Sequence, residues 1–345
     1  MPERTVILTQ RKQIMPYYPE RKPEPSGGEQ KQPRPAEKRG KLIRLGLLVF
    51  SCALVLFGAV KLIGYGADLV SSRNTSRELQ RLHEAGETAA PAPEQAIPET
   101  PVASETKASE SKAPETTVSA TGAPEMPVPE TGSLQPVPYP DNPGLKVSAR
   151  FRELRKKSGY IMGWLSMDGL EEAVALKDNT FFLTHDAMGK KNRNGALFLD
   201  AGTYLLTRPY TLFVYGHNMK SGSMFGRLKK YKDSAYCFSH RIITFDSLYE
   251  EGKYAVFAVA EINTVPGTGS WFDLWALDTD SRAEREKAIR ALEGRSVHGS
   301  ILDVQADDQL LLLITCLDGE DERLVVAARR LRENETETGL TLRGV

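Results

Sequence analysis

The chain has 345 residues, with 45 basic and 45 acidic side chains, so its formal net charge is zero. This balance excludes the overall basic charge that is typical of nucleic-acid-binding proteins. The balance also hides a segregation, because a basic, an apolar and a proline-rich stretch follow one another before the residues that can fold into a globular domain.

Residues 1–44 carry an excess of lysine and arginine, with many prolines and few large apolar side chains. This composition predicts a disordered basic tail. The run from Leu45 to Val60 has no charge, but it is slightly shorter than the ~20 residues of a spanning helix. Lys61 can extend its amine to the membrane surface, and the span then continues through Tyr65. The sequence therefore predicts a transmembrane anchor at 45–66.

A cleaved signal peptide is the competing interpretation of this apolar run. The basic region before it is too long for a signal peptide, and no convincing small-residue cleavage site follows it. We therefore expect an uncleaved, single-pass anchor in the cell membrane. Because basic flanks stay in the cytoplasm, residues 1–44 are predicted to be cytoplasmic and everything after Ala67 to be extracellular.

Two segments follow the predicted anchor. Residues 67–87 have few apolar positions, among them Leu79 and Leu82, and their weak amphipathicity predicts a marginal juxtamembrane helix. Residues 88–143 are dense in Pro, Glu, Thr, Ala and Ser. That composition predicts a disordered, extended linker, which lets a folded head move while it stays tethered.

The folded domain is expected at 144–334, with a short C-terminal tail at 335–345. Two helices are predicted in it, Val147 to Lys157 and Ser281 to Leu292, the second with Asp280 or Ser281 as its N-cap. The remaining apolar runs are short and rich in β-branched and aromatic residues, which indicates an antiparallel barrel or sandwich. These runs are Gly195–Leu199, Thr211–Tyr215, Ile242–Phe245, Tyr254–Ile262, Leu310–Thr315 and Leu324–Ala328.

Two predicted strands end in side chains of complementary chemistry. The leucine-rich run before Cys316 is followed by an acidic turn, and Arg323 then opens the next run. A hairpin would place this arginine beside the cysteine, where a cation favours the nucleophilic thiolate. His217 follows another strand after Gly216, where the backbone can turn sharply. Each residue alone is more often structural, but the two strand ends together favour a catalytic site.

The three cysteines cannot form a disulfide framework. Cys52 lies in the predicted span, and Cys237 lies among aromatic residues and is expected to be buried. Cys316 is therefore predicted to be a free thiol in an extracellular setting, where unpaired cysteines are unusual.

An ordered set of motifs between residues 147 and 331 resembles the sortases, specifically class B. The motifs are Gly163-Trp164-Leu165, Lys177 to His185, Gly195 to Asp200, Tyr215 to Met219 with Gly222 to Gly226 behind it, and Thr315-Cys316 with Arg323. The resemblance implies a mostly β fold, a closed eight-stranded sortase barrel. It also implies N-terminal helices and a helix in the long connection between the sixth and seventh strands.

The resemblance implies a membrane-anchored cysteine transpeptidase that acts on a Pro-x-Thr type sorting signal of secreted proteins. Cys316 would form a thioester at the carbonyl after the signal's threonine, His217 would protonate the departing amine, and Arg323 would position the substrate and stabilise the oxyanion. An amine from a cell-wall precursor or a pilin would then resolve the thioester. No cofactor, metal or nucleic acid is expected, because the sequence contains no metal-ligand spacing and no phosphate-binding glycine loop.

The substrate contacts are less closely defined. Tyr215 and Thr315 flank the catalytic pair and Asn179 is expected to face the same groove, with a packing role for each as the alternative. Class B sortases often have serine at the position of Ile314 and an acidic residue at that of Leu317, so the signal recognised stays open. Within the predicted linker, residues 128–132 resemble a sorting signal, with chance occurrence in a Pro-Glu-Thr-rich tract as the alternative.

Two other functions remain open at this stage. A cysteine endopeptidase would use the same residues and transfer the acyl group to water. An inactive sortase-like binding module is the second alternative, and the presence of all three of His217, Cys316 and Arg323 argues against it.

Overall fold

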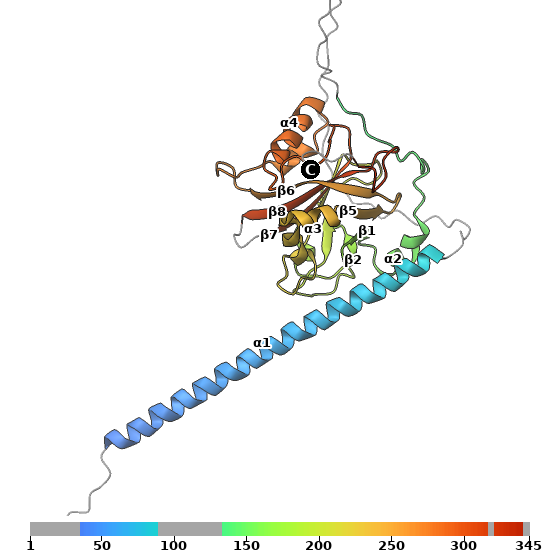
Figure 1. Cartoon of the computed structure of the whole chain (residues 1–345). Coiled ribbons are helices and arrows are strands. Elements are labelled where there is room, and N and C mark those ends of the chain that lie inside the picture. The colour runs from blue at the N-terminus through green and yellow to red at the C-terminus, as the bar shows by residue number, and fades with distance from the viewer. Residues whose placement is uncertain (1–34, 89–132, 317–320, 341–345) are drawn as a thin grey trace, which may run out of the picture. The chain divides into compact units, whose positions relative to one another are not determined.

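The computed structural model describes residues 35–88, 133–316 and 321–340 (Figure 1). Most of the predicted basic tail, residues 89–132 of the predicted linker and the last five residues lie outside these ranges. The chain divides into two units, Met1–Val60 and Lys61–Val345.

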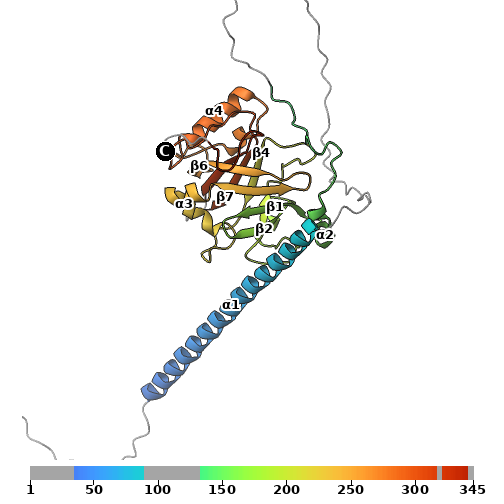
Figure 2. The same cartoon turned by 45° about the vertical axis from the view of Figure 1, so that its right-hand side comes forward.

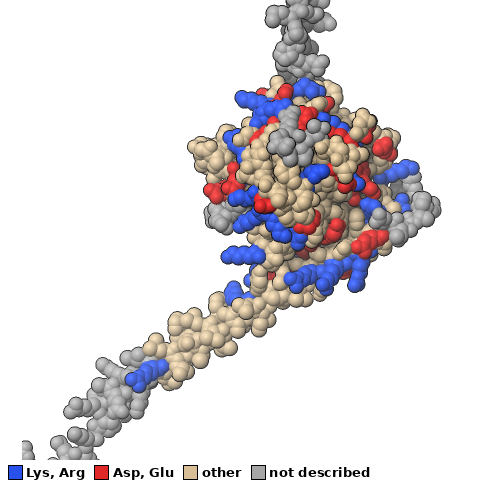
Figure 3. Space-filling view, viewed as in Figure 1, with Lys and Arg blue, Asp and Glu red and all other residues tan. Residues whose placement is uncertain are grey.

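Helix α1 (Pro35–Thr88) begins in the first unit, and its side chains from Arg44 to Val60 are exposed. Figure 3 shows an uncharged stretch along this helix, as expected from the sequence of Leu45 to Val60. Within Arg44–Gly86 the helix is long and apolar enough to cross a membrane, with a mean hydropathy of 2.3 in its most apolar window. This finding agrees with the predicted anchor.

The predicted juxtamembrane helix is the C-terminal part of α1 rather than a separate element. No proline interrupts the chain between Ala36 and Thr88, so the helix continues without a break. This part is also not marginal. Leu79 is 1% exposed and packs with Phe151 and Leu154, and the His83 ring stacks on Trp164 at 4.3 Å. Tertiary packing, which local amphipathicity does not reveal, stabilises this part of the helix.

The folded unit is built on a closed eight-stranded barrel, which confirms the predicted fold class. In their order around the barrel the strands are β1 (Ile161–Met167), β2 (Leu170–Ala175), β3 (Leu197–Leu199), β4 (Thr211–Tyr215), β7 (Leu310–Cys316), β8 (Glu322–Arg330), β6 (Lys253–Asn263) and β5 (Ile242–Ser247). The pairs β2–β3 and β4–β7 are parallel, whereas the sequence indicated an antiparallel arrangement. Both parallel pairs are joined by long crossover connections, as parallel pairing requires.

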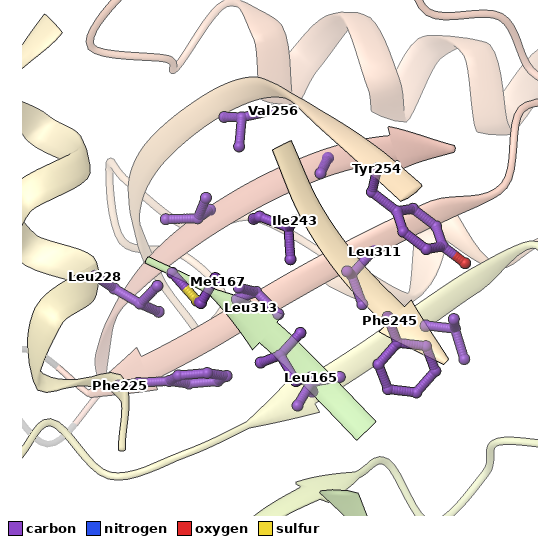
Figure 4. Packing of buried hydrophobic residues seen from close by; sticks show 14 of the residues in the cluster. Leu165, Met167, Phe225, Leu228, Ile243, Phe245, Tyr254, Val256, Leu311 and Leu313 are labelled. Atoms are coloured by element: carbon purple, nitrogen blue, oxygen red, sulfur yellow. The ribbon is translucent and has the colours of Figure 1, made fainter. Parts of the chain in front are cut away.

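Alternate residues of all eight strands fill the barrel interior. Figure 4 shows part of this core, with Leu165, Phe245 and Leu313 contributed by three different strands. Cys237 belongs to the same cluster and is buried, as predicted.

Two further apolar clusters cover the outside of the barrel. One lies between the strands β4, β6, β7 and β8 and the β6–β7 connection, which contains η3 (Leu274–Leu277) and α4 (Arg282–Glu293). The second lies under α2 (Ala149–Lys157) and the C-terminal part of α1. Figure 2 shows α4 and α2 at opposite sides of the barrel. The shorter helices are η1 (Phe181–Leu183), η2 (Phe225–Lys232) and α3 (Ser234–Ser239).

Both predicted domain helices are present, with bounds that differ by one or two residues. Ser281 caps α4, since its hydroxyl accepts a hydrogen bond from the main-chain N–H of Glu284. Residues 133–143, which the sequence assigned to the linker, pack against the folded unit. Leu134 and Tyr139 are buried, and the Tyr139 hydroxyl donates to the Leu205 carbonyl at 2.9 Å.

Candidate active site

The strand register brings the three predicted catalytic positions to one end of the barrel. β7 lies between β4 and β8. In the parallel β4–β7 pair Tyr215 lies opposite Ile314. His217 is two residues past Tyr215 and Cys316 is two residues past Ile314, so both positions lie at the same end of the barrel. In the antiparallel β7–β8 pair Cys316 lies directly opposite Arg323. Residues far apart in the sequence therefore meet at the adjoining ends of three neighbouring strands.

Along each strand, successive side chains point alternately into the barrel and out of it. Leu312 and Ile314 belong to the outer cluster beneath the β6–β7 connection, and Leu311 and Leu313 to the interior. On β8, Val325 and Ala327 belong to the same outer cluster, so with a period of two position 323 falls on the outer face. Thr315 falls on the interior face. It is 1% exposed, and among the described residues its hydroxyl makes no hydrogen bond.

The His217 ring is held by the main chain of another element. Its Nε2 lies 2.7 Å from the carbonyl oxygen of Leu183, the last residue of η1. A carbonyl can only accept, so Nε2 carries the proton in this contact. The backbone around the histidine is also held, because the His217 carbonyl accepts from the N–H groups of Met219 and Phe225, both at 3.0 Å.

Gly195 packs against the same ring. Its φ of +63° lies in the left-handed region, and a Cβ there would be 3.0 Å from the His217 Cδ2 atom and 2.3 Å from the Phe182 carbonyl oxygen. Only glycine allows the backbone to approach this closely. Gly195 opens one of the sequence motifs, but only the fold shows why glycine is required there.

Arg323 and Tyr215 lie close enough to interact electrostatically. Burial raises the pKa of Tyr215 well above its usual range, the Asp200 carboxylate raises it further, and the charge of Arg323 opposes this effect. Tyr215 is therefore a neutral hydrogen-bonding group beside a guanidinium. The Arg323 guanidinium itself donates to the carbonyl of Glu322 at 2.9 Å.

Asn179 is exposed and makes its contacts with the residues that follow β3. Its amide donates to the Asp200 carboxylate at 2.8 Å, and its carbonyl accepts from the N–H of Ala201 at 2.8 Å. Asn179 thereby orients Asp200, which in turn hydrogen-bonds Tyr215. The sequence alone did not identify Asp200 or Leu183 as site residues. The position of Asp200 directly after an apolar strand could have indicated it, whereas Leu183 acts through its main-chain carbonyl, which no sequence pattern marks.

Within residues 35–88, 133–316 and 321–340, no group of three or more His, Cys, Asp or Glu side chains gathers as a metal site would require. Burial raises the pKa of the Cys237 thiol to about 11, so this cysteine stays protonated at neutral pH.

Comparisons with known proteins find similarity to the sortases. Residues 175–331 match the family model described as the sortase domain. Sortase B of Listeria monocytogenes is 29% identical over 195 residues, which cover 53% of this chain and 75% of that protein. Sortase B of Staphylococcus aureus is 25% identical over 192 residues, covering 54% and 76%. A crystal structure of a Bacillus anthracis protein similar to sortase B shares 30% identity, covers 54% of this chain and 84% of that chain, and has a TM-score of 0.48.

Proposed function

The chain belongs to the sortase family, class B, and from this premise we propose that it cleaves a Pro-x-Thr type sorting signal and transfers the secreted protein to an amine. The observation that carries the proposal is the register of β4, β7 and β8, which brings His217, Cys316 and Arg323 to one end of the barrel. The acceptor is an amine of a cell-wall precursor or of a pilin. The apolar part of α1 anchors the enzyme in the cell membrane with its catalytic domain outside.

The reaction begins with attack of the Cys316 thiolate on the carbonyl carbon that follows the signal's threonine. A carbon–sulfur bond forms, the carbon–nitrogen bond breaks, and the departing amine takes a proton from His217. The acceptor amine then attacks the thioester, the sulfur leaves as thiolate, and the proton lost by the amine returns to His217. Because a thioester retains acyl-transfer potential, amide formation needs no nucleotide.

The contact with Leu183 supports different tasks for the two nitrogens of His217. Nε2 keeps its proton on the Leu183 carbonyl, so Nδ1 is the nitrogen that gives and receives the proton during the reaction. Arg323 stays charged throughout and presents a planar fork of N–H donors, which suits the oxyanion of each tetrahedral intermediate. Tyr215 lies beside it as a neutral group that contacts the peptide.

The test uses the full-length chain in detergent with a library of Pro-x-Thr peptides, with and without a glycine oligomer as the amine. Intact-mass spectrometry should detect a thioester on the wild-type protein and on Cys237→Ala, the matched control, and none on Cys316→Ala. A thioester that persists in Cys316→Ala would show that another residue is the nucleophile. Hydrolysed peptide as the sole product, even with the amine present, would identify an endopeptidase instead.

A further inference from the structure

The part of α1 beyond the apolar span is hydrogen-bonded to one loop of the domain, Asn192–Gly195. The Asn192 side chain donates to the main-chain carbonyl of Asp68 at 3.1 Å, and Arg193 donates to the Asp68 carboxylate at 2.6 Å. Asn194 donates to the Ser72 hydroxyl at 3.0 Å. Asn192 and Asn194 are each 2% exposed, so their contacts with α1 are shielded from water, whereas the Arg193–Asp68 pair is exposed.

The same loop is joined to the two groups that contact the His217 ring, Gly195 and the carbonyl of Leu183. Gly195, the next residue, packs against the imidazole. The N–H of Ala196 donates to the Phe182 carbonyl at 3.0 Å, and the N–H of Asn192 donates to the Thr184 carbonyl at 2.8 Å. These two bonds bracket Leu183, whose carbonyl accepts the proton of His217 Nε2. One short stretch of backbone thus joins α1 to both groups that orient the ring.

A second contact reaches the loop that contains His217. Ser72 and Leu79 of α1 line a small cavity together with Gly195 and Met224. Met224 pairs with Asn218 across this loop and has a φ of +48°, a conformation that a non-glycine residue holds only when its surroundings enforce it. The α1 helix therefore borders the His217 loop as well as the loop Asn192–Gly195.

We infer that Asp68 and Ser72 of α1 position His217, acting through the loop Asn192–Gly195. Ser72 and Asn194 are positioning residues in this arrangement, so this turn of α1 serves the catalytic site as well as the anchor. The inference rests on the proposed function, because it takes His217 as the group that transfers the proton. A buried amide that loses its partner shifts its loop, and a shift of about 1 Å at a reacting group can lower a rate by up to about a hundredfold.

The test uses the full-length chain in lipid nanodiscs and the transfer assay described above. Ser72→Ala should lower kcat about tenfold with KM within about twofold, since substrate binding is unchanged while the imidazole is misplaced. Ser72→Thr keeps the hydroxyl and has the neighbouring cavity for its methyl group, so it should restore kcat. Glu78→Gln is the matched control. It removes the 2.9 Å ion pair of α1 with Lys157 on α2 and should leave kcat unchanged.

Amide hydrogen exchange at Gly195 and Ala196 gives a readout that needs no activity. Exchange there should be faster in Ser72→Ala than in wild type, while exchange at the amides of α4 stays as in wild type. Unchanged kcat and unchanged exchange in Ser72→Ala, or an equal loss in Glu78→Gln, would overturn the inference. If the wild-type protein forms no thioester, the proposed function fails, while the exchange rates still report whether α1 holds the loop.

Discussion

At the residue scale, Arg323 is the charged group whose removal should affect the chemistry most selectively. Arg323→Ala should lower kcat/KM by about 10² to 10³, the usual cost of losing one oxyanion donor. Arg323→Lys keeps the charge but loses the planar fork, so its activity should fall between the two. Steady-state transfer kinetics measure both effects, with melting temperatures as the control for folding. Activity of Arg323→Ala within threefold of wild type would remove Arg323 from the mechanism.

Gly195 is the second residue with a sharply defined requirement. Gly195→Ala combines a left-handed φ with a Cβ that would meet the Phe182 carbonyl at 2.3 Å, so it should cost about 2–3 kcal/mol of the free energy of unfolding. Gly222→Ala is the matched control, because its φ of +76° is similar but nothing lies within 4 Å of its Cβ. That variant should lose only about 1–2 kcal/mol, the backbone cost alone. Urea unfolding compares them, and equal losses would contradict the steric argument.

Sequence patterns predicted the strand-end residues but not the groups that orient them. The apolar runs before Cys316 and after Arg323 are long enough to define a hairpin, and the observed register pairs the two residues directly. Thr315, by contrast, was placed beside the groove from its position in the chain, whereas its parity on β7 buries it in the interior. The carbonyl of Leu183 could not be predicted, because every residue has one and only the fold selects it.

At the element scale, α4 depends on a buried cation. Arg285 is fully buried and donates to the carbonyls of Ala306, Tyr210 and Asp308 at 2.6, 2.9 and 2.8 Å. Burial lowers its pKa to about 10, so it stays charged at neutral pH. These bonds tie the β6–β7 connection to the start of β4, and with it the outer wall of the barrel near the proposed site.

Arg285→Met should therefore destabilise the domain by about 3–5 kcal/mol, since several buried carbonyls lose their donor at once. Lys287→Met on the same helix is the matched control. Its side chain is exposed, so the change should cost at most about 0.5 kcal/mol. Urea unfolding of the three proteins gives the comparison. Similar losses in the two variants would show that the buried hydrogen bonds do not stabilise the connection.

The contact of α1 with β2 should depend on pH. Ser76 donates to both oxygens of the Glu172 carboxylate at 2.8 and 2.9 Å. Burial raises the pKa of Glu172 to about 7, the charge of Glu171 raises it further, and the Ser76 hydrogen bond opposes the shift. The folded protein therefore holds a proton that the unfolded chain releases near pH 4.5, and stability falls as pH rises between about 4.5 and 7.

Glu172→Gln should flatten this dependence, because glutamine is neutral throughout. Melting temperatures measured from pH 5 to 8 should fall less for Glu172→Gln than for wild type. Glu153→Gln, which changes an exposed carboxylate on α2, should follow the wild-type curve. Parallel curves for wild type and Glu172→Gln would mean that the carboxyl is not held protonated at this contact.

The same contact explains why the juxtamembrane helix was underestimated from the sequence. The polar residues Ser72 and Ser76 make the sequence pattern only weakly amphipathic, yet both form hydrogen bonds with polar side chains of the domain. Hydrophobic periodicity registers only apolar contacts. The helix Ser281 to Leu292, which combines an apolar face with a serine cap, was predicted almost to the residue as α4.

At the scale of the whole molecule, the order of segments determines where the catalytic domain works. A basic stretch precedes the apolar part of α1, and the domain follows it. Positive flanks are retained in the cytoplasm, so we expect the barrel to lie outside the cell, where the proposed substrates would be found. The sequence predicts that Cys316 is unpaired in that setting, which favours a nucleophile over a structural cysteine.

This orientation can be tested in intact cells with a membrane-impermeant maleimide. In a Cys316→Ala background, Glu153→Cys places a thiol on α2 at a site whose native side chain is 51% exposed, and Gln10→Cys places one in the predicted cytoplasmic tail. Glu153→Cys should be labelled in intact cells and Gln10→Cys only after permeabilisation. The background itself should stay unlabelled, because Cys52 lies in the apolar helix and Cys237 is buried. The reverse pattern would place the barrel in the cytoplasm, away from any secreted substrate, and the transpeptidase proposal could not hold.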